Sequence, residues 1–191
     1  MEKSRELGGQ LYVRTFRGVT NAAELVELAG GVVEETDAEA RQFARCVLMD
    51  LGNVVSEFHI KSALFKAVLA AIPDSGVRGK AASFRTNVLF NMSQTGKIVD
   101  AIAQFNVAAT STSIAVVGWV DSAAALQEYQ HLASNVQGAE FDPALLLSDP
   151  EFTGDDKKQR IIKLYKIPPA EMEVSSLDDC VVTRLAVKEI M

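Results

Sequence analysis

Histidine, cysteine and glycine, which often mark catalytic or cofactor sites, form no such motif in this chain of 191 residues. The two histidines, His59 and His131, belong to no recognisable metal-binding motif. Cys46 and Cys180 lie far apart and are expected to be buried, unbridged thiols of a reducing compartment. No phosphate-binding glycine loop and no Gly-x-Ser-x-Gly nucleophile motif occurs. We therefore expect no metal, no cofactor and no catalysis by this chain alone.

Charge is distributed unevenly along an acidic chain. The formal net charge is -6 at pH 7, which argues against a protein whose whole surface binds nucleic acid. Between residues 58 and 99, however, six basic residues stand against one acidic residue. This segment forms either ordinary solvated surface or a patch that contacts phosphate groups, and the sequence leaves both interpretations open.

Neither a secretion signal nor a membrane span is expected. The first nine residues are charged or polar for the most part and lack the apolar core of a signal peptide. No apolar run approaches the ~20 residues that a membrane-spanning helix needs. We predict a cytoplasmic and nuclear protein with one domain over residues 1–191, large enough for its core to bury about 70% of the extended chain's surface.

The elements that position any functional group are organised around residues 84–120. Alternating apolar side chains predict a strand over residues 83–93. An amphipathic helix is predicted over residues 97–107, with Asn106 closing it in the left-handed conformation. The almost wholly apolar residues 113–120 predict a strand that is covered on both faces.

The longest predicted helix follows Asp50, a good N-cap residue, and runs from Leu51 to Ile72. Apolar or small side chains recur along it at alternating steps of three and four residues. These positions are Val55, Phe58, Ser62, Phe65, Leu69 and Ile72. Such a stripe either faces the core or docks a partner, and the need to cover a sheet favours the core.

The remaining pattern completes a layered fold. Further elements are predicted as a strand over residues 10–16, a helical turn over 144–147, and helices over 22–29, 37–45, 123–137, 157–165 and 177–188. Helices outnumber strands, and the two alternate along the chain. The sequence therefore predicts an α+β (mixed α/β) single domain with one mixed, largely antiparallel sheet flanked by helices.

Five short motifs follow one another in a distinctive order. They are Phe16-Arg-Gly-Val-Thr-Asn-Ala-Ala-Glu-Leu25, Phe58-His-Ile-Lys-Ser-Ala-Leu64, Phe90-Asn-Met-Ser93, Ile161-Ile-Lys-Leu-Tyr-Lys-Ile167 and Leu177 to Lys188. Together they resemble the family of small kinase-binding subunits of the KEOPS (EKC) tRNA-modification complex, over nearly the whole chain. Each motif is dominated by apolar spacing, so their common order carries more weight than any single one.

Two departures from the family pattern stand out. One residue is inserted in the Phe58 motif. Many family members also have Arg-Thr-Leu-x-x-Glu before the Phe-Asn pair, where this chain reads Ala82-Ser-Phe-Arg-Thr-Asn87. The role of that arginine and glutamate carries over only if Arg85 substitutes for the arginine.

The resemblance implies a non-catalytic regulatory subunit of the KEOPS complex. Such subunits bind the complex's small atypical protein kinase (an ATPase) and are linked through it to the threonylcarbamoyl transferase subunit. They support attachment of threonylcarbamoyl to the adenosine next to the anticodon of tRNA, and archaeal relatives bind the single-stranded CCA end. The expected partners are thus the kinase and tRNA, with no membrane and no cofactor.

Two sets of site residues follow as hypotheses. Phosphate contacts to tRNA need Lys and Arg, and the basic segment offers Lys61, Lys66, Arg78, Lys80 and Arg85, with Phe84 or His59 as base-stacking groups. Kinase docking needs apolar side chains that the core does not use. On and around the last helix these are Val174, Val182 and Ile190, unless they merely complete the core.

Two alternatives belong to different functional classes. A standalone RNA-binding module predicts salt-dependent tRNA affinity without a protein partner. A small α/β enzyme with an unrecognised site predicts a deep polar pocket with strongly shifted titratable groups.

Overall fold

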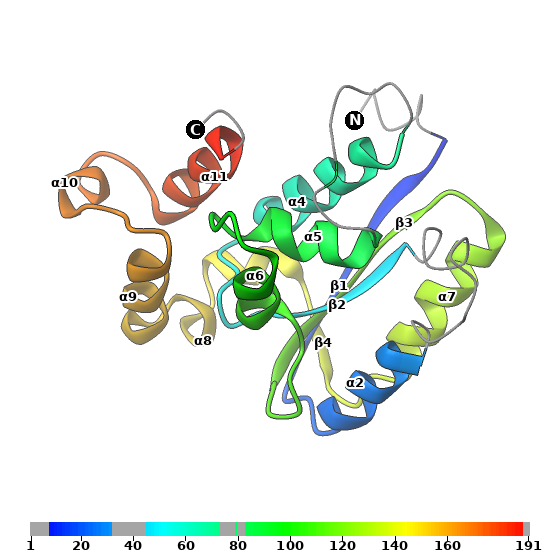
Figure 1. Cartoon of the computed structure of the whole chain (residues 1–191). Helices are drawn as coiled ribbons and strands as arrows, with labels where there is room; N and C mark the ends of the chain where they lie inside the picture. Colours follow the sequence, from blue (N-terminus) through cyan, green and yellow to red (C-terminus); the bar gives the residue numbers. More distant parts are fainter. Residues whose placement is uncertain (1–7, 32–44, 73–78, 80–82, 189–191) are drawn as a thin grey trace.

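A four-stranded sheet lies at the centre of the computed structural model, which describes residues 8–31, 45–72, 79 and 83–188 (Figure 1). Its strands, in the spatial order β2-β3-β1-β4, are β1 (Gln10–Arg17), β2 (Cys46–Asp50), β3 (Ser113–Val120) and β4 (Ala139–Phe141). Each pairing between these strands is antiparallel. The α+β class and the helix-flanked sheet are therefore confirmed.

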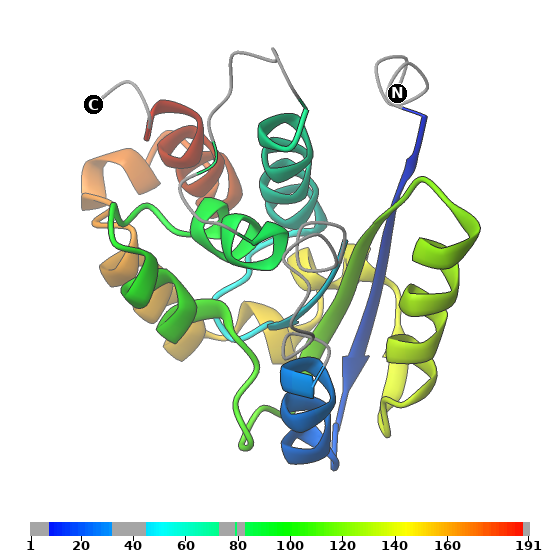
Figure 2. The same ribbon diagram turned by 45° about the vertical axis from the view of Figure 1, so that its right-hand side comes forward.

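Helices cover both faces of this sheet. They are α2 (Ala22–Gly31), α4 (Glu57–Ala70), α5 (Phe84–Met92), α6 (Ile98–Phe105), α7 (Ala123–Ser134), the 3-10 helix η1 (Pro143–Leu147), α8 (Pro150–Thr153), α9 (Asp155–Leu164), α10 (Pro169–Met172) and α11 (Leu177–Val187). Figure 1 shows α2 and α7 on one side of the strands and α4 and α5 on the other, and Figure 2 shows the same layers turned by 45°. The predicted helix over residues 37–45 lies outside the described residues, apart from Arg45.

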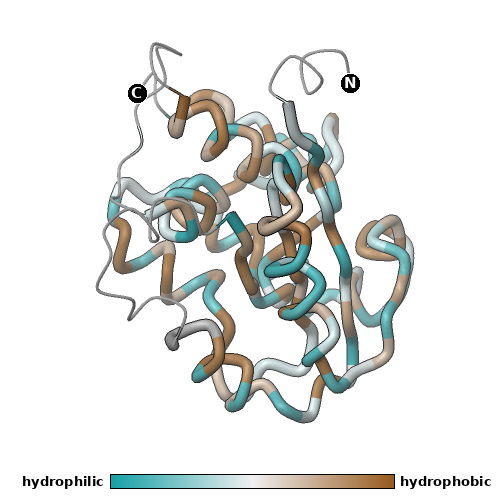
Figure 3. Tube along the Cα trace, turned by 90° about the vertical axis from the view of Figure 1, so that its right-hand side faces the viewer, coloured by the Kyte–Doolittle hydropathy of each residue, from teal (hydrophilic) through white to brown (hydrophobic). Residues whose placement is uncertain are grey.

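Strand β3 is buried on both faces, as predicted. Ile114 and Val116 pack in one apolar cluster with α2 and α7, whereas Ala115, Val117 and Trp119 pack in a second cluster with α4 and α5. Figure 3 shows hydrophobic residues recurring along the strands and along the helices packed on them. Because successive side chains of a strand point to opposite faces, β3 contributes side chains to a separate core on each face of the sheet.

The predicted strand over residues 83–93 is wrong, because this segment forms helix α5. Ser83 caps the helix, and its Oγ accepts a hydrogen bond from the Thr86 amide at 3.2 Å. Phe84, Val88 and Met92 are buried at steps of four, so the residues that alternate as in a strand also fit a helical period. The helix packs against α4 and α6, which buries most of its second half and hides its amphipathic pattern.

Two capping predictions are also wrong. Helix α4 begins at Glu57 and not after Asp50, whose carboxylate instead accepts hydrogen bonds from the Gly52 amide and the Ser111 hydroxyl. Asn106 ends α6 in an extended conformation, with φ of -71°, and not in the left-handed one. The helix over residues 98–105 is itself confirmed.

Candidate protein-docking site

Helix α4 turns a different face to the core from the one predicted. Its N-cap Ser56 accepts a hydrogen bond from the His59 amide at 3.0 Å, which fixes where the helix starts. The side chains that it buries are His59, Ile60, Ala63, Leu64, Ala67 and Val68. Phe58, by contrast, is 58% exposed, and Ser62 and Phe65 are only half-buried. The prediction that the Phe58 stripe faces the core is therefore wrong, and the outward face of α4 carries large apolar groups.

A largely apolar groove of about 470 Å³ lies between α4 and α11, and we call it the α4–α11 groove. Phe58 and Phe65 line it from α4, Val182 and Leu185 line it from α11, and Leu11 of β1 contributes its side chain. Figure 1 shows these two helices next to each other on the same side of the sheet. Such a groove can receive apolar side chains of another protein.

Two lysines of α4 lie at the groove, and each bonds to a residue of α4 or α11. The Lys66 ammonium donates a hydrogen bond to the Leu185 carbonyl at 2.7 Å and thereby joins α4 to α11. Lys61 forms an ion pair with Glu57 one turn earlier on α4, at 2.7 Å. Both lysines line the groove, so its rim is basic while its walls are apolar.

The structure brings together only part of the predicted tRNA-contact set. Lys61 and Lys66 meet at the α4–α11 groove, whereas Arg85 lies on α5 and donates a hydrogen bond to Asn106 Oδ1 at 2.7 Å. Arg78 and Lys80 lie outside the described residues. Of the three candidates that the structure describes, two therefore lie together on α4 and the third lies on α5.

Both proposed base-stacking groups are buried. Phe84 packs in the core, and His59 is fully enclosed, so neither offers a ring face to a base in this structure. His59 Nε2 lies 2.9 Å from the Met92 carbonyl, which can only accept, so this nitrogen carries the proton. Burial lowers the pKa of His59 to about 4, against the opposing effect of its hydrogen bond to Met92. His59 thus acts as a neutral structural residue at ordinary pH.

The predicted kinase-contact residues divide in a similar way. Val182 lines the α4–α11 groove, and Val174 is 83% exposed just before α11, away from this groove's walls. Ile190 lies outside the described residues. One of the three residues therefore marks the groove directly.

The enzyme alternative predicts a polar pocket with shifted titratable groups, and a polar hollow of about 500 Å³ in the described part of the chain can be compared with it. It contains Lys157, whose pKa burial lowers to about 8. The Lys157 ammonium donates to the Leu51 carbonyl at 3.0 Å, which links α9 to the end of β2. In the same hollow, the Asp50 carboxylate accepts hydrogen bonds from the Gly52 amide and the Ser111 hydroxyl. These contacts stabilise the fold.

Two further kinds of site are not found among the residues that the structure describes. No group of three or more His, Cys, Asp or Glu side chains there could hold a metal ion. In the same residue ranges, none of the helices combines the length and apolarity needed to cross a bilayer.

Sequence reasoning missed the exposed face of α4 because it followed the bulky side chains. The buried face uses two small residues, Ala63 and Ala67, and a polar one, His59, among its members. Those residues recur at steps of four and could have revealed the second stripe. The link between Lys66 and Leu185 has no local sequence signal, since its partners are 119 positions apart.

Comparison with known proteins assigns this fold to a family. Residues 16–189 match the family described as kinase binding protein CGI-121. The chain is also 30% identical over 176 residues to the EKC/KEOPS complex subunit TPRKB of Danio rerio, covering 92% of this chain and 89% of the relative. The family match therefore includes β2, β3 and β4 of the sheet and the helices α4 and α11.

Proposed function

This chain belongs to the CGI-121 family of kinase-binding proteins, and we propose that it is a non-catalytic regulatory subunit of the KEOPS complex. In this role it binds the complex's small atypical kinase through the α4–α11 groove. The observation that carries the choice of surface is Phe58, a large apolar side chain that is 58% exposed at the edge of an apolar groove. Aromatic residues in such positions commonly dominate binding energy.

The groove has the features that a protein interface needs. Its centre is apolar through Phe65 and Val182, and its rim is polar through Lys61 and Lys66. The bond from Lys66 to the Leu185 carbonyl fixes the spacing of α4 and α11 before any partner arrives. A preformed groove lowers the entropy that binding must overcome.

We also propose that the subunit supports threonylcarbamoylation of the adenosine next to the anticodon of tRNA and contacts tRNA itself. Lys61, which lies on the exposed side of α4 and forms an ion pair with Glu57, is the best-placed phosphate contact among the described candidates. The acidic remainder of the chain limits indiscriminate binding. The kinase links this subunit to the transferase subunit, and the tRNA modification takes place in the cytoplasm and nucleus.

Mixing the purified chain with the KEOPS kinase of its own organism tests this function. We expect a stable complex in size-exclusion chromatography and no turnover by the isolated chain. A standalone RNA-binding module would bind tRNA but leave the kinase free, and a small α/β enzyme would turn over a substrate without either partner. Failure of the complex to form at micromolar concentration contradicts the proposal.

A further inference from the structure

Strand β1 extends beyond the strand that covers its outer side. β4 pairs with residues 15–17 of β1, whereas β1 itself begins at Gln10. The chain leaves the sheet soon after β4, because Pro143 has no amide hydrogen to donate and begins η1. The β4 side of residues 10–14 is therefore open in the described part of the chain, and we call it the β1 edge.

The direction of the β3 backbone groups follows from two hydrogen bonds at the ends of β2. In an antiparallel sheet, consecutive residues direct their N–H and C=O groups to opposite neighbouring strands. The Trp119 amide donates to the carbonyl of Arg45, which immediately precedes β2, at 3.0 Å. At the other end of β2, the Leu51 amide donates to the Ser113 carbonyl at 3.0 Å. Trp119 and Ser113 therefore face β2, and Gly118, next to Trp119, faces β1.

The same alternation sets the direction of the β1 backbone groups. Gly118 lies opposite Tyr12 in the register of the two strands, so the Tyr12 backbone bonds to β3. Arg14 does the same, whereas Leu11 and Val13 direct their amides and carbonyls to the other side. Two amides and two carbonyls therefore face the β1 edge without a strand partner among the described residues.

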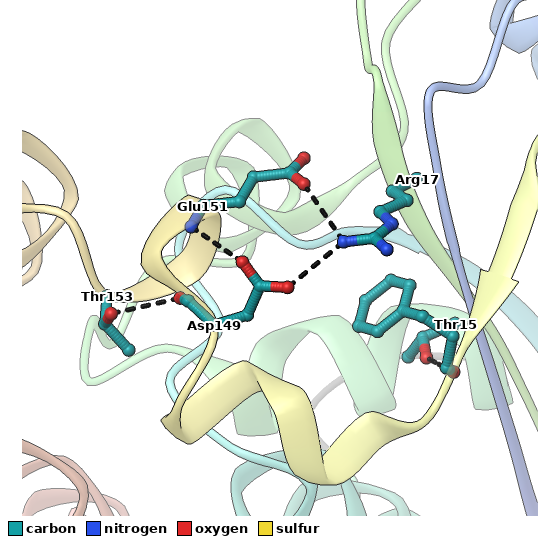
Figure 4. Close-up of polar contacts among 6 residues, drawn as sticks. Thr15, Arg17, Asp149, Glu151 and Thr153 are labelled. Carbon is teal, nitrogen blue, oxygen red and sulfur yellow. Dashed lines mark hydrogen bonds and ion pairs between the residues drawn. The ribbon is translucent and has the colours of Figure 1, made fainter.

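The covered half of β1 is fixed to its neighbours. The Thr15 hydroxyl donates to the carbonyl of Phe141, the last residue of β4, at 2.6 Å. Figure 4 shows Arg17 facing Asp149 and Glu151, with its Nη1 3.1 Å from Asp149 Oδ2 and 3.7 Å from Glu151 Oε2. These contacts fix the register in which β4 ends before it reaches the β1 edge.

The β1 edge adjoins the α4–α11 groove through Leu11. The Leu11 side chain lines the groove that also contains Phe58, while the Leu11 backbone faces the β1 edge. Leu11 and Val13 both pack their side chains against the core cluster to which α4 contributes. The edge and the groove therefore form one continuous surface.

This continuity determines which kind of partner fits. A protein that fills the groove removes water from Leu11 and its neighbours. Backbone amides and carbonyls that lose water without gaining a hydrogen bond cost free energy, so the partner must supply donors and acceptors at the spacing of a strand. An extended backbone has this spacing, whereas a helix bonds most of its own amides and carbonyls internally.

We propose that an extended segment of the kinase pairs with residues 10–14 of β1 as an added strand, next to the apolar contacts in the α4–α11 groove. This inference rests on the proposed kinase-binding function. Side chains of the segment opposite Leu11 and Val13 are apolar, because they fall on the groove side of the sheet. Those between them fall on the other side, beside Tyr12 and Arg14. In this strand-addition mode of recognition, backbone pairing supplies affinity and the alternating side chains supply specificity.

Amide hydrogen exchange of the unchanged chain, followed residue by residue by NMR, tests the pairing directly. In the free chain, the Leu11 and Val13 amides should exchange quickly, whereas the Tyr12 and Arg14 amides should exchange slowly because they bond to β3. In the kinase complex, exchange at Leu11 and Val13 should slow by about tenfold or more. The alternation along one strand provides an internal control.

Val13→Pro tests the same pairing through affinity, because it removes an amide that the added strand needs. Proline is tolerated at an edge position whose amide has no partner in the ladder, so the unfolding midpoint should stay close to that of the unchanged chain. Val13→Thr keeps the amide and a branched side chain of similar size, and is the matched variant. Isothermal titration with the kinase should give a Kd about tenfold higher for Val13→Pro than for Val13→Thr.

Results for the free chain can overturn the inference. Slow exchange of the Leu11 and Val13 amides in the free chain would mean that the β1 edge is covered without the kinase. Protection that grows with the concentration of the free chain would assign the edge to a second copy, which also contradicts the inference.

Results for the complex separate this inference from the proposed function. Leu11 and Val13 amides that stay fast in the complex, or equal Kd values for Val13→Pro and Val13→Thr, overturn strand pairing. If Phe58→Ser still weakens kinase binding in that case, docking in the groove stands and the added strand alone is wrong. If no complex forms, the proposed function and the added strand are both wrong.

Discussion

The Ser56 hydroxyl donates a hydrogen bond to Asp178 Oδ1 at 2.5 Å and joins the first turns of α4 and α11, although the two residues are 122 positions apart. The same oxygen accepts the His59 amide that starts α4. One small side chain therefore caps one helix and orients the first turn of another. With the bond from Lys66 to Leu185, it fixes α11 against α4 near both ends of α11.

Ser56→Ala removes both of these bonds. We expect a loss of about 2 kcal/mol in the free energy of unfolding, because an N-cap contributes about 1 kcal/mol and a buried bond to a carboxylate adds at least as much. The matched control is Ser122→Ala, which removes an exposed cap of α7 whose Oγ accepts from the Ala125 amide. Urea unfolding compares the two variants. Equal losses contradict a linking role for Ser56.

His59 makes stability depend on pH in a defined direction. Its folded pKa of about 4 lies below the unfolded value of about 6.5, so the unfolded chain binds the proton first as pH falls. Its contribution is fully present above about pH 6.5 and is lost as pH falls towards 4. His59→Gln should therefore remove about 2 kcal/mol of the stability change between pH 7.5 and pH 5.

The control for this prediction is His131→Gln, since His131 is the second of two histidines and is exposed. Urea midpoints at the two pH values give the comparison. A pH dependence that His131→Gln reduces and His59→Gln leaves intact contradicts the assignment.

Lys61 tests the proposed tRNA contact. Lys61→Ala breaks the partly exposed pair with Glu57, which contributes little to stability. We expect weaker tRNA binding and a slope of log affinity against log salt that is smaller by about 1, the value for one lost phosphate contact. Filter binding with Lys163→Ala on α9 as the control measures both. An unchanged slope removes Lys61 from the tRNA surface.

Elements with a clear local signal could be predicted from the sequence. Strand β3 is nearly all apolar, and the helix predicted over residues 177–188 forms as α11, with Ser176 as its N-cap. The prediction for residues 84–92 is wrong because their alternating aromatic and β-branched side chains favour a strand. The Ser83 cap and the contacts with α4 and α6 stabilise a helix instead. Tertiary packing overrode local propensity there.

The candidate site could be predicted only in part. Val182 is predictable because it lies off the inward apolar stripe of α11, which can be read from the sequence of that helix alone. The position of Phe58 is not predictable, because α4 has two apolar stripes and the contacts with α5 and the sheet determine which of them is buried. The walls of a groove between distant segments depend on the fold as a whole.

Kinase affinity of a Phe58→Ser variant tests the central claim most directly. Phe58 is already exposed, so the variant should keep the unfolding midpoint of the unchanged chain, and Val99→Ser is the matched exposed control. Isothermal titration with the KEOPS kinase should show a Kd raised roughly 30-fold by Phe58→Ser, equivalent to about 2 kcal/mol, and no change for Val99→Ser. A Kd that Phe58→Ser leaves unchanged contradicts docking of the kinase in the α4–α11 groove.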